Sequence, residues 1–323
     1  MAHKRSRLIQ HITYAACLAF FKIFSWTPLP VAHAVGAGLA RAAYHLVPRI
    51  KTIGMANLDI AYGDSLSRQE KERILRGSVK NLGLVAVEFT RVPTLLEQVP
   101  NMNISVKGLE HVDKTRGGVI FSGHLGNWEW MLPVGAHLGI RGIVIARAFD
   151  DPRMNAFVDK TRRASGLKIV LKDAAMEPLL RKIPEGYYAG LLADQSPRDN
   201  AVPVTFFGEP TWATIGPALI AMRSNTPIYP VSMTRDDHGD YTIEFYPALE
   251  LADTGNTLAD LQSNTQLCQD ALETMIRKHP EQWLWFHKRW KKRPRLEREW
   301  AERVARKKAD NNERIGTQTL EQE

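Results

Sequence analysis

Cysteine is scarce in this sequence of 323 residues, in which only Cys17 and Cys268 occur. Two thiols so far apart give neither a disulfide framework nor a zinc site, which favours a reducing compartment. Internal repeats and low-complexity tracts are also missing. Ser122 lacks the Gly-x-Ser-x-Gly context of an activated serine, so no serine or cysteine nucleophile is evident.

The composition is that of a globular protein, with 44% apolar and 24% charged residues. Short apolar runs alternate with longer mixed segments, which predicts a single α/β domain with a mostly parallel, mixed central sheet flanked by helices. Strands are predicted at 118–121, 142–146, 168–171, 188–192 and 228–232, and 241–246 is predicted as an edge or antiparallel strand. Helices are predicted at 67–88, 128–138, 152–165, 176–182, 216–224 and 257–278.

Net charge is unevenly distributed along the chain. The sequence carries +8 overall, and 288–308 holds eleven Lys or Arg against three Glu, which is also +8. The basic character therefore belongs to one segment, whose candidate partners are an anionic membrane surface, an acidic protein, a phosphorylated substrate or nucleic acid. No recognised nucleic-acid-binding motif accompanies these cations, so we do not expect nucleic acid to be a partner.

The N-terminal region has the pattern of a membrane anchor. Basic residues at 4, 5 and 7 precede an apolar stretch at 12–26, and a second one follows at 31–47. No Ala-x-Ala cleavage site follows. Fifteen residues of helix span about 22 Å, less than a bilayer core of about 30 Å. We interpret 1–47 as a short-spanning or interfacial anchor; the alternative is a helix buried in the core.

Aromatic residues and cations adjoin near the C-terminus. Trp283, Trp285, Phe286 and Trp290 lead into the basic run 288–293. Rings beside cations suit a lipid headgroup layer, whereas a solvated charged helix explains the cations but not the tryptophans. We therefore predict three regions, which are the anchor at 1–47, a catalytic domain at 48–290 and a basic tail at 291–323.

A histidine and a carboxylate stand at the end of the first strong strand, in "GVIFSGHLGNWEW" at 118–130. On one helix His124 and Glu129 would diverge by about 140°, so a close pair requires His124 in a turn and Glu129 in the first helical turn. Glu129 would then accept the Nδ1 proton of His124 and leave Nε2 free as a base toward a substrate hydroxyl. The spacing alone is uninformative, because ten His and 35 acidic residues give about one such match by chance.

Five blocks in one order carry a resemblance to a known family. They are "GHLGNWEW", "RAFDDPRMNAFVDKTRRASG", "LLADQSP", "VTFFGEPTWATIGPALIA" and "PEQWLWFHKRWK". The chain resembles the bacterial lipid A biosynthesis lauroyl/myristoyl acyltransferases of the lysophospholipid acyltransferase superfamily, from the N-terminal helix to about Lys292. The resemblance implies a glycerolipid-acyltransferase-like fold. It also implies an enzyme at the cytoplasmic face of the inner membrane, with no metal or other cofactor.

The reaction implied by the resemblance is acyl transfer from acyl carrier protein to the hydroxyl of a 3-hydroxyacyl chain on a lipid A precursor. His124 matches the catalytic base and Glu129 its partner. The implied substrate-binding residues are Asn127, Arg147, Arg163, Asp194, Gln195, Phe206 and Phe207. Arg147 is expected at a phosphate or phosphopantetheine group, and the backbone N–H groups of the Gly126–Asn127 turn at the oxyanion.

Each of these assignments has a structural alternative. Asp194 would be a cap or turn former, Arg147 a surface partner of Asp150 or Asp151, Arg163 a solvated cation, and the two phenylalanines core rather than acyl tunnel. The alternative functions are an acyltransferase for another glycolipid or aminolipid, and a non-enzymatic membrane-binding protein with the same fold. Acyl chain length and acceptor position do not follow from the sequence.

Overall fold

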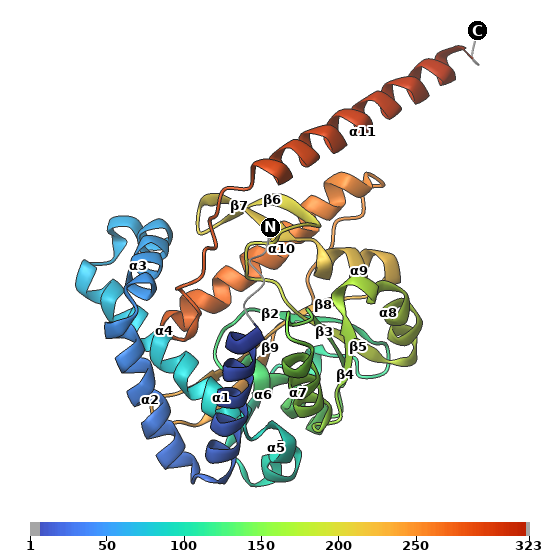
Figure 1. Cartoon of the computed structure of the whole chain (residues 1–323). Coiled ribbons are helices and arrows are strands. Elements are labelled where there is room, and N and C mark those ends of the chain that lie inside the picture. Colours follow the sequence, from blue (N-terminus) through green and yellow to red (C-terminus); the bar gives the residue numbers. More distant parts are fainter. Residues whose placement is uncertain (1–6, 321–323) are drawn as a thin grey trace.

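A seven-stranded sheet flanked by helices forms the centre of the molecule (Figure 1). The computed structural model describes residues 7–320, except for the side chains of 173 and 308–320. The strand order is β1-β9-β8-β2-β5-β3-β4, and the neighbours from β8 to β4 pair in parallel. β9 is antiparallel to β8 and parallel to β1. The predicted α/β class with a mostly parallel, mixed sheet is confirmed.

The strands and helices have the following bounds. The main sheet contains β1 (Ile104–Lys107), β2 (Gly118–Ser122), β3 (Arg141–Ala146), β4 (Lys168–Leu171), β5 (Tyr187–Leu192), β8 (Ile228–Arg235) and β9 (Tyr241–Phe245), and β6 (Ala201–Phe206) and β7 (Glu209–Thr214) form a separate hairpin. The helices are α1 (Arg7–Trp26), α2 (Leu29–Leu46), α3 (Pro48–Tyr62), α4 (Arg68–Phe89), α5 (Val92–Gln98), α6 (Trp128–His137), α7 (Pro152–Arg163), α8 (Met176–Lys182), α9 (Gly216–Ser224), α10 (Thr257–Lys278) and α11 (Pro294–Leu320).

The central strand β2 is buried on both faces because helices cover the sheet from both sides. Val119 and Phe121 point into one core, with residues of α4, α8, α9 and α10. Ile120, between them, points into the other, with residues of α5 and α6. This alternation is the period of two of a strand, and full burial explains its uninterrupted apolar sequence.

The predicted helices and strands are present with small shifts at their ends. Ser67 is the N-cap of α4 and forms a capping box with Glu70, at the start of the helix predicted at 67–88. The strand predicted at 241–246 is antiparallel, but β1 covers its outer side, so it is not an edge. The β6–β7 hairpin was not predicted.

The first apolar helix is longer than the sequence pattern indicated. α1 has 20 residues, about 30 Å of helix, so the predicted length of about 22 Å was too short. Among the described residues it is the one helix long and apolar enough to cross a membrane, judged by length and composition alone. Its Phe21 ring packs on Phe89 and Phe157, while Ile12, Ile23 and other apolar side chains are exposed. The alternative of a helix buried in the core does not hold for α1.

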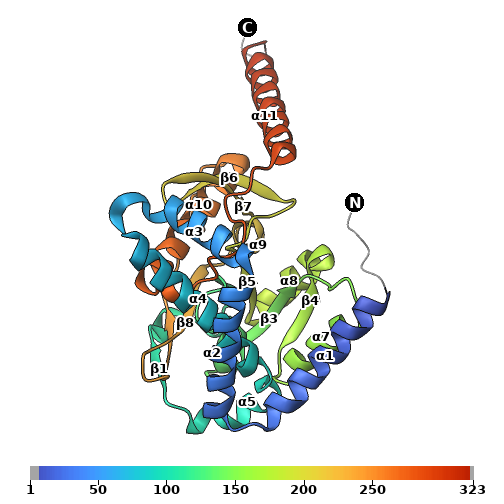
Figure 2. The ribbon, with the colours of Figure 1, turned by 60° about the vertical axis from the view of Figure 1, so that its left-hand side comes forward.

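The C-terminal aromatics are not a headgroup layer. Trp283 and Trp285 are completely buried and meet edge to face, with Phe207 packed against both. Burial of these large rings stabilises the core more than a position at a polar boundary would. The basic helix α11 leaves the body at the β6–β7 hairpin and points away from it, on the side opposite to the turn that joins α1 and α2 (Figures 1 and 2). The division at 47 and 290 stays a prediction.

Candidate active site

The turn between β2 and α6 holds the histidine of the motif. Gly126 has φ +59, and a Cβ there would lie 1.9 Å from the Met233 carbonyl oxygen, so only glycine fits. Asn127 caps α6 by accepting the Trp130 N–H at 3.0 Å. The helix begins at Trp128, and Glu129 lies in its first turn as predicted. His124 is therefore in the turn, at the carboxyl end of the central strand.

The carboxylate that contacts His124 is Asp194, not Glu129. His124 Nδ1 lies 2.9 Å from Asp194 Oδ1, and the His124 backbone N–H donates to Asp194 Oδ2 at 2.8 Å. The prediction that Glu129 accepts the Nδ1 proton is wrong, and topology explains why. β5 pairs with β2 and its Ala193 N–H donates to the Ser122 carbonyl at 2.9 Å, so the residues that follow the two strands adjoin.

Asp194 is held in a fixed, buried position. It is 1% exposed, and Oδ2 also accepts the Trp283 indole N–H at 2.9 Å. Burial favours its neutral form, but the His124 charge and the hydrogen bonds from His124 outweigh burial, so the pKa of Asp194 lies well below its usual value. An ionised, immobile carboxylate accepts from Nδ1 and leaves His124 Nε2 free.

His124 keeps access to the adjoining cavity, with a side chain that is 21% exposed. Burial lowers its pKa, but the Asp194 charge and hydrogen bond raise it more, so the pKa of His124 lies above the ordinary value. Trp128 packs on the imidazole with ring centroids 5.0 Å apart. The ring is thus oriented on two sides.

Glu129 forms a bidentate ion pair with Arg162 of α7. Arg162 donates from Nε to Oε2 at 3.1 Å and from Nη2 to Oε1 at 2.6 Å. Burial lowers the pKa of Arg162, but Glu129 raises it more, so the guanidinium group stays protonated. Both side chains line the cavity of His124. Glu129 therefore fixes a cation beside the imidazole instead of touching it.

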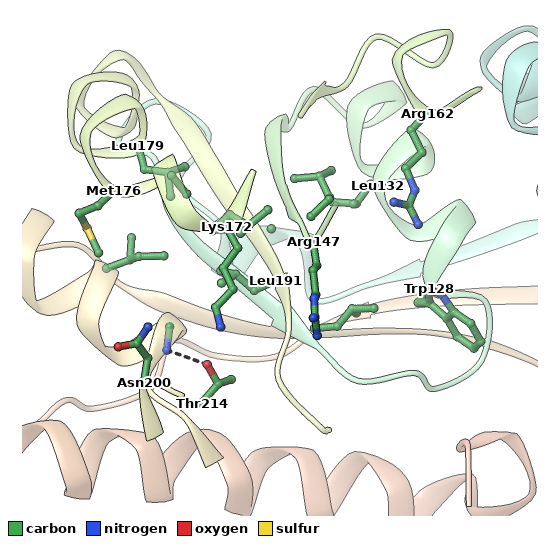
Figure 3. A pocket seen from close by; sticks show the side chains of 18 of the residues that line it. Trp128, Leu132, Arg147, Arg162, Lys172, Met176, Leu179, Leu191, Asn200 and Thr214 are labelled. Atoms are coloured by element: carbon green, nitrogen blue, oxygen red, sulfur yellow. Dashed lines mark hydrogen bonds between the residues drawn. The ribbon is translucent and has the colours of Figure 1, made fainter. Parts of the chain in front are cut away.

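A largely apolar cavity of about 460 Å³ opens at His124. Helices α6, α8 and α9 and the carboxyl ends of β3 and β5 provide its walls. Figure 3 shows Met176 and Leu179 on one side, Trp128 and Arg162 on the other, and Arg147 and Lys172 extending between them. The cavity thus joins a base and three cations to an apolar interior.

The remaining predicted site residues divide between the cavity and the core. Arg147 lines the cavity, and it has no hydrogen-bond or ion-pair partner among the side chains that the structure describes, so the pair with Asp150 or Asp151 is not formed. Gln195 is exposed beside His124, with Nε2 3.5 Å from Nδ1. Asn127 is buried and donates to Glu88 at 2.6 Å, so it has a structural position.

Arg163, Phe206 and Phe207 lie away from both the cavity and His124. Arg163 is one helical position from Arg162 and donates to the Ile169 carbonyl at 3.1 Å. Phe206 and Phe207 are buried in the aromatic core, which matches the core alternative and not the acyl tunnel. Phe207 has φ +52 in the β6–β7 turn, a conformation that is unfavourable for a bulky residue and is compensated by burial of the ring.

The backbone N–H groups of the Gly126–Asn127 turn are not free for an oxyanion. Gly126 donates to the Gln282 carbonyl at 3.1 Å and Asn127 to the Met233 carbonyl at 2.7 Å. That prediction is wrong, because the turn is fastened to its neighbours by these same bonds. Arg162 was missed as a site residue, and the signal that could have found it is the helical phase of α7, which turns adjacent side chains about 100° apart.

Comparisons with known proteins identify the family. The site itself places an imidazole with a free nitrogen beside a largely apolar cavity. The sequence profile described as bacterial lipid A biosynthesis acyltransferase matches residues 2–292. The chain belongs to this family and is an acyltransferase.

Individual relatives are distant and of mixed description. The chain is 25% identical over 229 residues to the phosphatidylinositol mannoside acyltransferase of Mycobacterium tuberculosis, with 67% of this chain and 70% of that one covered. It is 23% identical over 276 residues to the lipid A biosynthesis lauroyltransferase of Escherichia coli, with 83% and 87% covered. The 1-acyl-sn-glycerophosphate acyltransferase PlsC of Thermotoga maritima aligns over 72% of this chain and 97% of its own, with a TM-score of 0.33 and 12% identity.

Proposed function

We propose that this enzyme transfers an acyl chain from acyl carrier protein to the hydroxyl of a 3-hydroxyacyl chain on a lipid A precursor. The observation that carries the proposal is the free Nε2 of His124 in an apolar cavity, with Nδ1 held by the buried Asp194. A base in that position needs a hydroxyl substrate whose neighbouring groups are apolar. The 3-hydroxyacyl chain of a glycolipid has both properties.

The reaction proceeds through a single tetrahedral intermediate, without a covalent acyl-enzyme. His124 Nε2 takes the acceptor proton, the alkoxide oxygen attacks the thioester carbonyl, and the carbon–sulfur bond breaks. The proton on His124 then goes to the departing thiolate. No serine or cysteine lies among the described residues that line the cavity, which supports direct transfer.

Arg162 is the donor that we assign to the oxyanion. Two of its nitrogens bind Glu129, and Nη1 has no partner in the described part of the chain. A preorganised cation in a largely apolar cavity stabilises charge that develops in the transition state. Glu129 thus acts by positioning Arg162, and Asp194 by positioning His124.

Access from a bilayer is supported by the apolar surface. Phe149 and Leu192 line the cavity and are about half and one third exposed, and α1 and α2 also expose large apolar side chains. The apolar N-terminal helix and the family favour membrane association. We assign the enzyme to the cytoplasmic face of the inner membrane, where acyl carrier protein is available.

The cations supply contacts for both substrates. Arg147 and Lys172 at the cavity suit the phosphopantetheine phosphate or the acidic carrier protein. Lys288, Lys291 and Lys292 are exposed before α11 and suit the carrier or lipid phosphates, whereas Arg289 is buried and Arg293 binds Ser196. No nucleic acid, metal or other cofactor has a role in the scheme.

A second acceptor has specific support. The mycobacterial relatives act on a phosphatidylinositol mannoside according to their names, and they match this chain at 25% identity. The same His124 and Asp194 would activate a sugar hydroxyl. The alternative is therefore acyl transfer to another glycolipid with the same chemistry.

Two experiments test the proposal. Mass spectrometry of lipids from strains with and without the protein should show loss of one secondary acyl chain from lipid A; loss from another glycolipid instead selects the second acceptor. In the second experiment, purified His124→Ala protein should transfer acyl groups from acyl carrier protein at least about 100-fold more slowly than the parent, while vesicle binding is unchanged. Near-normal transfer by a folded His124→Ala protein would refute the mechanism.

A further inference from the structure

A basic groove lies between α2 and α4, apart from the catalytic cavity. Its volume is about 650 Å³, and it is lined by Ala37, Gly38, Ala40, Arg41, Tyr44, His45, Arg76 and Lys80. No carboxylate is among these residues. The groove is therefore a concave surface with positive charge on both walls.

The groove lies beside the point where α2 and α4 pack most closely. A Cβ added to Gly36 would lie 2.8 Å from the Gly83 carbonyl oxygen, and one added to Gly83 would lie 2.5 Å from that of Gly36. The backbones touch at this crossing, and the groove lies beside it, toward the C-terminus of α2 and the N-terminal half of α4. Figure 2 shows α2 and α4 side by side.

Two of the three groove cations have no partner in the described part of the chain. Arg41 and Lys80 form no hydrogen bond or ion pair with the described residues, and both are exposed. Arg76 pairs with Glu72 at 3.1 Å and lies over the buried Tyr44 ring at 5.5 Å from its centroid. The net charge of the groove with Glu72 included is therefore positive.

Apolar side chains are also exposed on α2. Leu39 is 53% and Leu46 79% exposed, and with Val31 and Val35 they form a stripe on the outer side of the helix. Helical phase places Arg41 about 125° around α2 from the centre of this stripe, so the stripe and the cation lie on the two flanks of the outward side of the helix. Apolar side chains on one flank and unpaired cations on the other are the pattern of a helix that lies in a bilayer interface.

From these observations we infer that the groove binds the phosphate of an anionic phospholipid headgroup while the α2 stripe contacts the acyl chains. Arg41 and Lys80 would supply the charge, and Arg76 would be ordered by Tyr44. An acidic carrier protein fits less well, because it would leave the apolar stripe exposed to water. The inference does not depend on the proposed reaction, and it gives the catalytic domain a defined orientation beside α1.

The test compares binding of the full-length protein to phosphatidylcholine vesicles with and without 30% phosphatidylglycerol. The Kd for vesicles without phosphatidylglycerol, divided by the Kd for vesicles with it, measures the preference for anionic lipid. The contribution of α1 is common to both and cancels in this ratio. Arg41→Gln with Lys80→Gln should lower the ratio by up to about 25-fold, because each cation near an anionic surface contributes about fivefold. Arg49→Gln with Arg73→Gln removes two exposed charges outside the groove and should lower it clearly less.

A variant without a charge change separates a groove from general surface charge. A Cβ on Gly38 meets no atom within 4 Å, so Gly38→Met fills the groove without a clash. It should reduce the preference for phosphatidylglycerol severalfold and leave acyl transfer in detergent unchanged. The inference would be overturned if both double variants lost the same preference for phosphatidylglycerol and Gly38→Met lost none. It would also be overturned if the groove bound acyl carrier protein in place of lipid. Acyl transfer in detergent by these variants keeps failure of the groove distinct from failure of the reaction.

Discussion

Two carboxylates lie at the candidate site, and their surroundings differ. Asp194 lies behind His124 and is buried, and its oxygens accept from the His124 ring and backbone and from Trp283. Glu129 lines the cavity, is 15% exposed, and both its oxygens accept from Arg162. The first carboxylate orients the imidazole, and the second holds a cation.

This difference shows that proximity in sequence does not determine which carboxylate forms a hydrogen bond with a histidine. Glu129 is five residues from His124 and Asp194 seventy, yet only Asp194 contacts the ring. The carboxyl ends of adjacent parallel strands bring side chains together with a precision that a helix start does not offer. Removal of each group should therefore have effects of different size and kind.

Asp194→Asn should reduce the rate more than removal of the charge at Glu129, Arg162 or Arg147. The amide can donate to Nδ1 and stabilise the wrong tautomer, which in an analogous serine protease triad lowers kcat about 10⁴-fold. Loss of the carboxylate also removes the main influence that raises the pKa of His124, so burial then lowers it. The rate of the parent should rise with pH as His124 loses its proton, and in the variant this rise should occur at lower pH.

Steady-state rates between about pH 5 and 9 measure both effects. Glu129→Gln is the matched control, because the Glu129 charge is a smaller influence on the same pKa. It should shift the profile less and reduce the rate less. A larger pH shift for Glu129→Gln than for Asp194→Asn would mean that Glu129, and not Asp194, is the carboxylate that positions His124.

Arg162→Gln should have an intermediate effect, about 10²- to 10³-fold on kcat, as expected for loss of one oxyanion donor. Arg163→Gln is the neighbouring control, since Arg163 points to the Ile169 carbonyl and not to the cavity. It should retain a near-normal rate. If the two variants lose equal activity, Arg162 acts only through the stability of α7, which thermal unfolding of both proteins would show.

The sequence allowed the elements of this fold to be predicted, but not their contacts. The motif at 118–130 indicated a turn at His124, and the apolar runs indicated the strands, because these signals are local. The pairing of β2 with β5, which brings Asp194 to His124, depends on strand order and leaves no local pattern.

Burial of aromatic and charged side chains was the least predictable property. Trp283 and Phe207 look alike in sequence whether they face lipid or a core, and only the packing of the β6–β7 hairpin on 283–290 distinguishes the two. Arg289 sits within a basic run but is fully buried, where it donates to the Trp212 carbonyl at 2.7 Å. Arg162 and Arg163 differ by one helical step, so their assignment needed the exact phase of α7.

Arg147→Gln should have the smallest effect, since this side chain lines the cavity but is exposed to solvent. An exposed charge contact contributes about 0.2–1 kcal/mol, so KM for acyl carrier protein should rise by up to about fivefold while kcat is unchanged. Arg141→Gln is the control at the opposite end of β3, where the side chain donates to the Glu185 carbonyl. The rise should shrink at high salt because screening weakens exposed contacts. A fall in kcat instead of a rise in KM would place Arg147 with the reacting groups, so that the catalytic part of the cavity would include this side chain.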